Sequence, residues 1–177
     1  MLNEIIMAGF GGQGVLSMGR ILAEAALAED KRTSWLPSYG PEIRGGTSNC
    51  HVVLSDEEVA SPVVTRATAA IIMNKPSLDR FEKNVISGGT LIINSSLIDR
   101  ESFRDDITVY YVPANSIAAE LGSPKAANMV MLGAFLAATH AVKTESVEQV
   151  INEDFGEKKA SMAELNKRAL AAGFKSI

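Results

Sequence analysis

The sequence predicts an α/β fold in which helices cover a mostly parallel sheet. Short apolar runs such as residues 4–8 (EIIMA) and 69–73 (AAIIM) have the length and composition of buried strands. Longer stretches of helix-forming residues separate these runs, above all residues 14–28 and 126–142. Alternation of strands and helices along a chain is typical of a parallel sheet with helices packed on its faces.

Length and composition indicate one globular domain over residues 1–177. The chain has 177 residues, which lies within the usual ~100–200 residues per domain. Its 46% hydrophobic and 21% charged residues match an ordinary soluble domain. The formal net charge of −4 has the wrong sign for a nucleic-acid-binding surface, so we expect no nucleic-acid partner.

The sequence also limits the compartment and the cofactors. Residues 1–6 lack the basic segment and apolar run of a signal peptide, and no uncharged apolar stretch reaches the ~18 residues of a membrane span. The single cysteine, Cys50, can form neither an internal disulfide nor a cysteine-ligated cluster or zinc site. We therefore expect a cytoplasmic protein without a membrane segment.

The first half of the chain begins with a strand at residues 4–8, a helix at 14–28 and a second strand at 33–36, which Pro37 ends. Residues 48–54 and 59–64, separated by Ser-Asp-Glu-Glu, predict an antiparallel hairpin inserted into the sheet.

The second half continues the alternation. Its expected elements are strands at residues 69–73, 90–94 and 108–112 and helices at 76–84, 126–142 and within 146–173. Pro76 suits the first turn of a helix, and Gly173 is placed as a helix C-cap. Residues 126–142 are apolar in almost every direction, which predicts a buried helix.

A glycine-rich loop follows the first strand. Residues 9–14 (GFGGQG) match the G-x-G-x-x-G spacing between a strand and a helix, which makes the expected fold a three-layer, Rossmann-like α/β sheet. Glycines let the backbone approach a ligand, and the helix N-terminus offers free N–H groups to an anion. The candidate ligand-binding residues here are Gly9, Gly11, Gly12, Gln13 and Gly14.

Three interpretations of this loop stay open: NAD(P) binding, binding of another phosphate or anion, and glycines that serve only the turn. The NAD(P) interpretation needs an acidic residue at the end of the second strand, about 20 residues on. Residues 32–39 contain no carboxylate, and Asp30 precedes the strand. The indication for NAD(P) is therefore weak.

A second loop, residues 38–46 (SYGPEIRGG), combines a carboxylate, a guanidinium and an aromatic ring with three glycines. Charged residues on loops often carry function. The alternative is a solvated loop with a Glu42–Arg44 surface pair of little energetic value. The candidate residues of this loop are Tyr39, Gly40, Pro41, Glu42, Arg44, Gly45 and Gly46.

Taken together with residues 53–58 (VLSDEE) and Ser61-Pro62, the two loops resemble the gamma subunit of 2-oxoacid:ferredoxin oxidoreductases. The pyruvate, 2-oxoisovalerate and 2-oxoglutarate enzymes share this subunit type. The resemblance extends over essentially the whole chain, including residues 166–174, and is greatest to the 2-oxoglutarate and branched-chain types.

The resemblance implies a complex that decarboxylates a 2-oxoacid on thiamine diphosphate and Mg, passes electrons through iron–sulfur clusters to ferredoxin, and forms an acyl-CoA. The implied partners are alpha and beta subunits, with a delta subunit as a further candidate, and ferredoxin through the complex. The chain has no Gly-Asp-Gly thiamine signature and no set of cysteines. We therefore expect it to carry no catalytic residue and no cofactor by itself, and to shape the active-site wall or the CoA pocket.

Two other functions remain as alternatives: a free-standing NAD(P)-binding enzyme, and a binding or scaffold module without catalysis. No metal site is expected, because His51 and His140 are far apart in sequence and no spacing adds carboxylate ligands. Cys50 is expected to be an inert core thiol, and Trp35 fits either the core or a subunit contact. We also expect a homodimer of the isolated chain that covers apolar surface of residues 126–142 or 35–46.

Overall fold

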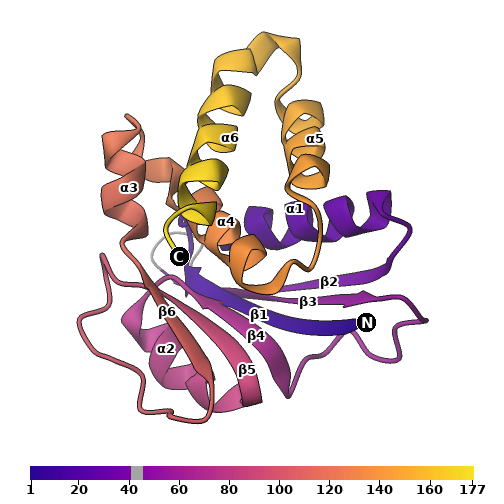
Figure 1. Cartoon of the computed structure of the whole chain (residues 1–177), viewed down its shortest axis with the longest axis vertical. Coiled ribbons are helices and arrows are strands. Elements are labelled where there is room, and N and C mark those ends of the chain that lie inside the picture. The colour runs from indigo at the N-terminus through magenta and orange to yellow at the C-terminus, as the bar shows by residue number, and fades with distance from the viewer. Residues whose placement is uncertain (41–45) are drawn as a thin grey trace.

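A computed structural model describes residues 1–40 and 46–177 and shows a six-stranded sheet with helices on both faces (Figure 1). This confirms the predicted α/β class. The strands are β1 (Leu2–Phe10), β2 (Arg32–Tyr39), β3 (Thr47–Ser55), β4 (Ala67–Ile72), β5 (Val85–Asn94) and β6 (Thr108–Val112). The α-helices are α1 (Val15–Ala28), α2 (Lys75–Phe81), α3 (Ala114–Glu120), α4 (Ala127–Thr139), α5 (Thr144–Phe155) and α6 (Ala160–Phe174). Single 3₁₀ turns form η1 (Glu82–Asn84), η2 (Pro124–Ala126) and η3 (Glu157–Lys159).

The sheet has the order β2-β3-β1-β4-β5-β6, and β3 runs against its two neighbours. β1, β4, β5 and β6 pair in parallel. The predicted antiparallel element therefore exists, but its predicted partner is wrong: β3 forms a hairpin with β2, and residues 59–64 form no strand. Pro62 lacks a ladder donor, and both edges of β3 are already paired with β1 and β2.

The predicted end of β2 at Pro37 is also wrong, because the strand continues to Tyr39. β2 is the edge strand of the sheet and hydrogen-bonds only to β3. A proline is tolerated in an edge strand when its missing N–H would face away from the neighbouring strand.

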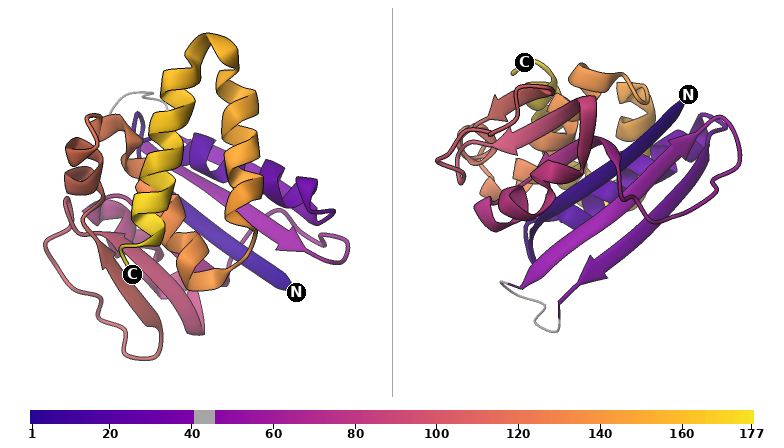
Figure 2. Two further views of the ribbon diagram at one scale, coloured as in Figure 1. Left: turned by 45° about the horizontal axis from the view of Figure 1, so that its top comes forward. Right: turned by 90° about the horizontal axis from the view of Figure 1, so that it is seen from below.

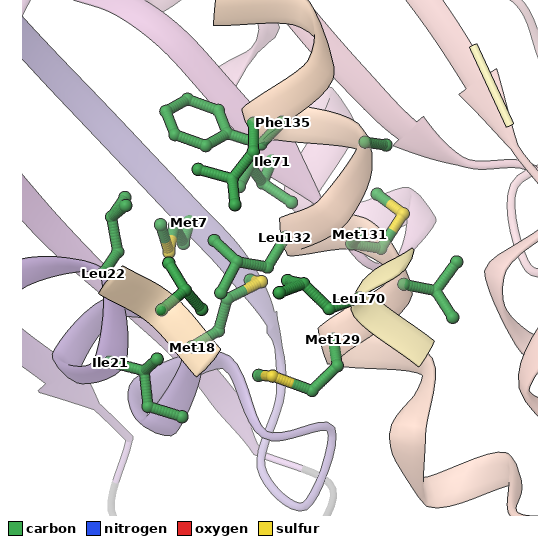
Figure 3. Close-up of a cluster of buried hydrophobic side chains, with 14 of the residues drawn as sticks. Met7, Met18, Ile21, Leu22, Ile71, Met129, Met131, Leu132, Phe135 and Leu170 are labelled. Atoms are coloured by element: carbon green, nitrogen blue, oxygen red, sulfur yellow. The ribbon is translucent and has the colours of Figure 1, made fainter. Parts of the chain in front are cut away.

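Helices α1 and α4 pack on one face of the sheet, and α5 and α6 form a helical hairpin that packs on them (Figures 1 and 2). Figure 3 shows the core between these layers, where Met7 of β1 and Met18 of α1 meet Leu132 of α4. Every residue from 127 to 136 is buried, which confirms the predicted buried helix. α6 of the same chain packs on this helix, so its apolar surface is already buried, and of the two surfaces expected to contact another chain only residues 35–46 stay a prediction.

The close contact of α4 with α6 depends on two glycines. A Cβ at Gly133 would lie 2.8 Å from the backbone N of Phe174, and a Cβ at Gly173 would lie 2.9 Å from Cα of Val130. Gly173 is therefore an interhelical contact inside α6, and its predicted role as a C-cap is wrong. Glycine at such positions lets two helix backbones approach each other.

The opposite face of the sheet is covered by α2 over β1 and β4. β1 and β4 are the two middle strands of the sheet, and on this face no helix of the described residues covers β2 and β3, which α1 covers on the other face (Figure 2). Beside α2, the buried Glu82 anchors the loop before β6, where it accepts hydrogen bonds from the amide of Phe103 at 2.9 Å and from Arg100 at 3.0 Å.

None of the helices in the described part of the chain is long and apolar enough to span a bilayer.

Candidate ligand-binding site at the glycine loop

The glycine loop joins β1 to α1 at the carboxyl end of β1, as predicted. Gly12 has φ +93° and Gly14 has φ +74°, a conformation that side chains with a Cβ rarely adopt. Gly14 is the N-cap of α1, and neither a side-chain cap nor an acidic residue occupies the first turn of that helix. The first amides of a helix have no intrahelical acceptor, so this N-terminus keeps free donors and a partial positive charge.

The side chain of Gln13 holds the glycine loop together through hydrogen bonds to two neighbouring segments. Its Oε1 accepts hydrogen bonds from the amide of Phe10 at 2.6 Å and from Nδ2 of Asn74 at 3.4 Å. A Cβ at Gly9 would lie 2.8 Å from Cβ of Met73, so the absence of a side chain there leaves room for this packing. Gly9 and Gln13 therefore shape the loop from its buried side.

Gly14 has a second role beside its backbone conformation. Its carbonyl accepts a hydrogen bond from Nδ2 of Asn128 at 3.2 Å, and a Cβ at Gly14 would lie 2.9 Å from Cγ of the same side chain. Asn128 lies in the first turn of α4. The glycine loop is thus held against the second helix of the same layer.

The structure brings the two predicted loops together. The amide of Gly11 donates to the carbonyl of Gly46 at 2.8 Å, and the amide of Gly40 donates to the carbonyl of Thr47 at 2.9 Å. The remaining candidates of the second loop lie outside the described residues; they are Pro41, Glu42, Arg44 and Gly45.

A pocket of ≈ 490 Å³ opens beside the glycine loop. Its lining residues are Phe10, Gly11, Gly12, Gly14, Val15, Leu16, Ser17, Tyr39, Thr47 and Ser48. Leu16 and Tyr39 give the pocket apolar surface, and Tyr39 is 67% exposed. Backbone amides and hydroxyl groups form the rest of the lining. No carboxylate lines the pocket within the described residues. This chemistry suits a ligand with an anionic group joined to an apolar body.

Sequence reasoning missed Thr47 and Ser48. Register pairing of β1 with β3 places Thr47 opposite Phe10 and Ser48 opposite Gly9. Ser48 is only 6% exposed, and its hydroxyl has no hydrogen-bond partner among the described residues. Sequence reasoning could find these two residues only by pairing β3 with β1, because that pairing puts the start of β3 beside the glycine loop.

Other residues weighed from the sequence have structural roles. Burial raises the pKa of the Cys50 thiol to about 12, against a small lowering by a hydrogen bond with Trp35, so the expectation of an inert core thiol is supported. Trp35 packs against Gly19 of α1 and is still 37% exposed, and its predicted place in a subunit contact stays a prediction. Nδ1 of His51 accepts a hydrogen bond from the amide of Val64 at 3.0 Å.

Fold and site together define an α/β protein with a candidate ligand pocket, at which the glycine loop and the N-terminus of α1 meet. Among residues 1–40 and 46–177, no three His, Cys, Asp or Glu side chains are grouped to hold a metal ion. The chain belongs to the family described as pyruvate ferredoxin/flavodoxin oxidoreductase, whose sequence model matches residues 4–176.

Named relatives support the resemblance to gamma subunits. The chain is 44% identical over 172 residues to ketoisovalerate oxidoreductase subunit VorA of Methanothermobacter thermautotrophicus, a match that covers 96% of this chain and 35% of VorA. It is 37% identical over 154 residues to 2-oxoglutarate synthase subunit KorC of Methanocaldococcus jannaschii, covering 85% of this chain and 82% of KorC. The chain therefore spans about a third of VorA and most of KorC.

Solved structures share the fold. The gamma subunit of keto/oxoacid ferredoxin oxidoreductase from Geobacter sulfurreducens has a TM-score of 0.84 at 30% identity, over 98% of this chain and 97% of that chain. The 2-oxoglutarate:ferredoxin oxidoreductase of Magnetococcus marinus, with 2-oxoglutarate, coenzyme A and succinyl-CoA bound, has a TM-score of 0.90 at 21% identity. That match covers 98% of this chain and 30% of that one, and it shows the fold alone.

Proposed function

We propose that this chain is the gamma component of a multi-subunit 2-oxoacid:ferredoxin oxidoreductase of the 2-oxoglutarate or branched-chain type. Such an enzyme oxidatively decarboxylates a 2-oxoacid to an acyl-CoA and reduces ferredoxin. Family membership over residues 4–176 supports the assignment, and the VorA and KorC relatives support the two substrate types.

The observation that carries the proposal is the pocket at the glycine loop. Its volume of ≈ 490 Å³ lies within the usual range of ~300–1,000 Å³ for ligand sites. The N-terminus of α1 and the amide of Gly12 suit a phosphate group of CoA, while Leu16 and Tyr39 suit its apolar parts. In this role the chain binds and orients CoA and forms one wall of the active site, with Glu42 and Arg44 as further candidate contacts.

The remaining cofactors do not fit this chain. Cys50 is its single cysteine and is buried, so it cannot hold an iron–sulfur cluster. We assign thiamine diphosphate, Mg and the iron–sulfur clusters to the alpha and beta subunits, with delta as a further candidate, and the contact with ferredoxin to the assembled complex.

The alternative of a free-standing NAD(P)-binding enzyme is not favoured. In dinucleotide-binding sheets the second strand lies beside the first and ends in an acidic residue that binds the ribose. Here the antiparallel β3 separates β2 from β1, and β2 ends at Tyr39 without a carboxylate. The other alternative is a scaffold subunit that binds no ligand, and the kinetic experiment below distinguishes it from the proposed function.

Kinetics of the assembled complex test the proposal. Gly11→Val places a branched side chain where a ligand must approach backbone, and we expect the KM for CoA to rise about tenfold or more with the KM for the 2-oxoacid unchanged. Ala119→Val is the control, since it places the same valine side chain on the exposed side of α3, away from the pocket. An unchanged KM for CoA in a folded, assembled Gly11→Val complex would assign the glycines to the turn alone.

Purification under native conditions tests the partners. We expect mass spectrometry to find alpha and beta subunits with the chain, and we expect the purified chain alone to reduce no viologen dye with 2-oxoacid, thiamine diphosphate and CoA. Turnover by the pure chain would refute the assignment. For the isolated chain we also propose a homodimer through residues 35–46, where Trp35 and Tyr39 are exposed, to be checked by light scattering over a dilution series.

A further inference from the structure

A second pocket lies on the other face of the sheet, away from α1 and α4. It has a volume of ≈ 470 Å³ and lies between β2 and β3 on one side and the end of α2 on the other. The right-hand view of Figure 2 shows the strands of this face of the sheet. Its lining residues are Ile6, Leu36, Ser38, Asn49, His51, Val63, Val64, Thr65, Arg80, Phe81, Lys83 and Asn84. The proposed function assigns no role to this pocket.

The charge of this pocket is positive. Arg80 at the end of α2 and Lys83 in η1 line it, and no carboxylate does so within the described residues. Neither cation has a described carboxylate within ion-pair distance, whereas Arg20 and Arg100 each pair with two carboxylates and Arg104 pairs with one. The Arg80 guanidinium instead lies 4.8 Å from the ring centroid of Phe81. A cationic pair without acidic partners attracts an anion.

A buried amide points to a ligand independently of the charges. Asn49 is only 6% exposed and its side chain makes no hydrogen bond among the described residues, where Nδ2 of Asn3 is the one fully enclosed side-chain atom without a partner; the Asn49 amide is therefore open to the pocket. It borders the pocket together with Arg80. A side-chain amide that has no protein partner and opens on the pocket can donate a hydrogen bond from its Nδ2 to a bound anion.

His51 adds a fixed donor. Because its Nδ1 accepts the hydrogen bond from Val64, the neutral ring carries its proton on Nε2, which is the remaining nitrogen for a ligand. Burial, together with the charge of Arg80, lowers the pKa of His51 and keeps the ring neutral at pH 7. The exposed apolar side chains of Leu36 and Val63 complete the lining.

We propose that this pocket binds a small organic oxyanion, a carboxylate or phosphate joined to an apolar body. The head group is held by Arg80, Lys83 and the open amide of Asn49, and the body lies against Leu36 and Val63. Ligand pockets typically combine apolar walls with a few convergent polar groups in this way.

NMR resonances of the His51 ring in the 177-residue chain report binding directly, because the chain has two histidines and a His140→Gln variant assigns them. The probes are phenyl phosphate and 3-phenylpropanoate, with 3-phenylpropanamide as the uncharged control. We expect saturable shifts of His51 with at least one anionic probe and none with the amide. The probe that binds identifies phosphate or carboxylate as the preferred head group.

Two double variants with the same charge change decide the role of the cations. Arg80→Gln/Lys83→Gln should weaken probe binding about tenfold or more, since two charge-assisted contacts are lost. Lys158→Gln/Lys159→Gln, on η3 at the far tip of the α5–α6 hairpin (Figure 1), should leave binding unchanged. All four residues are exposed, so both variants should fold.

The proposal is wrong if neither anionic probe shifts His51 saturably, or if both double variants bind equally well. Loss of the His51 response in Gly11→Val would also overturn it, since the probe would then occupy the glycine-loop pocket. The test uses the chain without CoA or partner subunits, so it can fail while the proposed oxidoreductase function stands.

Discussion

Replacing Gly173 by alanine tests the close contact between α4 and α6. A Cβ at this position would lie 2.6 Å from the carbonyl carbon and 2.9 Å from Cα of Val130 on α4. Both atoms belong to the backbone, so no side-chain rotation can relieve the overlap. The helices must move apart, which opens the buried layer that Leu132 and Leu170 fill (Figure 3).

The expected cost follows from two opposing effects. Overpacking of a well-packed core costs ~1–3 kcal/mol, and a backbone overlap belongs at the upper end of that range. Alanine regains ~1 kcal/mol of helix propensity over glycine. We therefore expect Gly173→Ala to lower the free energy of unfolding by about 2 kcal/mol, which is a decrease in Tm of ~4–8 °C for a domain of this size.

Urea unfolding followed by circular dichroism measures this change. Ala172→Ser also adds one heavy atom, at the neighbouring and partly exposed position of α6, and should alter stability by no more than ~0.5 kcal/mol. If Gly173→Ala were as stable as the unmodified chain, α4 and α6 could not approach each other as closely as described.

Three further predictions concern buried titratable groups. Since the pKa of Cys50 is raised to about 12, a thiol reagent should label the chain slowly in buffer and fully in urea; rapid labelling of the folded chain would contradict its burial. The pKa of His51 is lowered by burial and by Arg80, so the unfolded state binds more protons and stability should fall as the pH drops below about 6.5. His51→Gln should reduce this pH dependence of the free energy of unfolding, measured with urea. If the free energy fell equally with pH in both proteins, the lowered pKa of His51 would be refuted. Burial opposes ionisation of Glu82, but hydrogen bonds from Ser102, Arg100 and the amide of Phe103 outweigh it and lower its pKa. The ionised Glu82 side chain therefore stabilises the fold above pH ~4.3, and this stabilisation is lost as the pH falls through the lowered pKa. Glu82→Gln should lower the free energy of unfolding by ~1–3 kcal/mol at neutral pH. In thermal unfolding, the Tm of this variant should depend less on pH in the acid range than the Tm of the unmodified chain.

Several features of this protein were determined by the sequence alone. The alternation of strands and helices, the position of the glycine loop between the first strand and the first helix, and the burial of α4 were all predicted and are all confirmed. Each depends on the local composition and period of a short segment, which the neighbours in the chain largely set.

Only the tertiary structure decided which strands pair. The valines of residues 59–64 are compatible with a strand, yet β3 pairs with β1 and β2, and in those pairings the side chains on both faces of β3 are buried. This choice places Ser48 at the glycine loop and Asn49 at the pocket beside Arg80. Likewise, Gly173 has the sequence context of a helix end, and only its contact with Val130 shows an interhelical role. Strand order and helix approach depend on contacts between residues far apart in the chain, and local propensity carries no information about them.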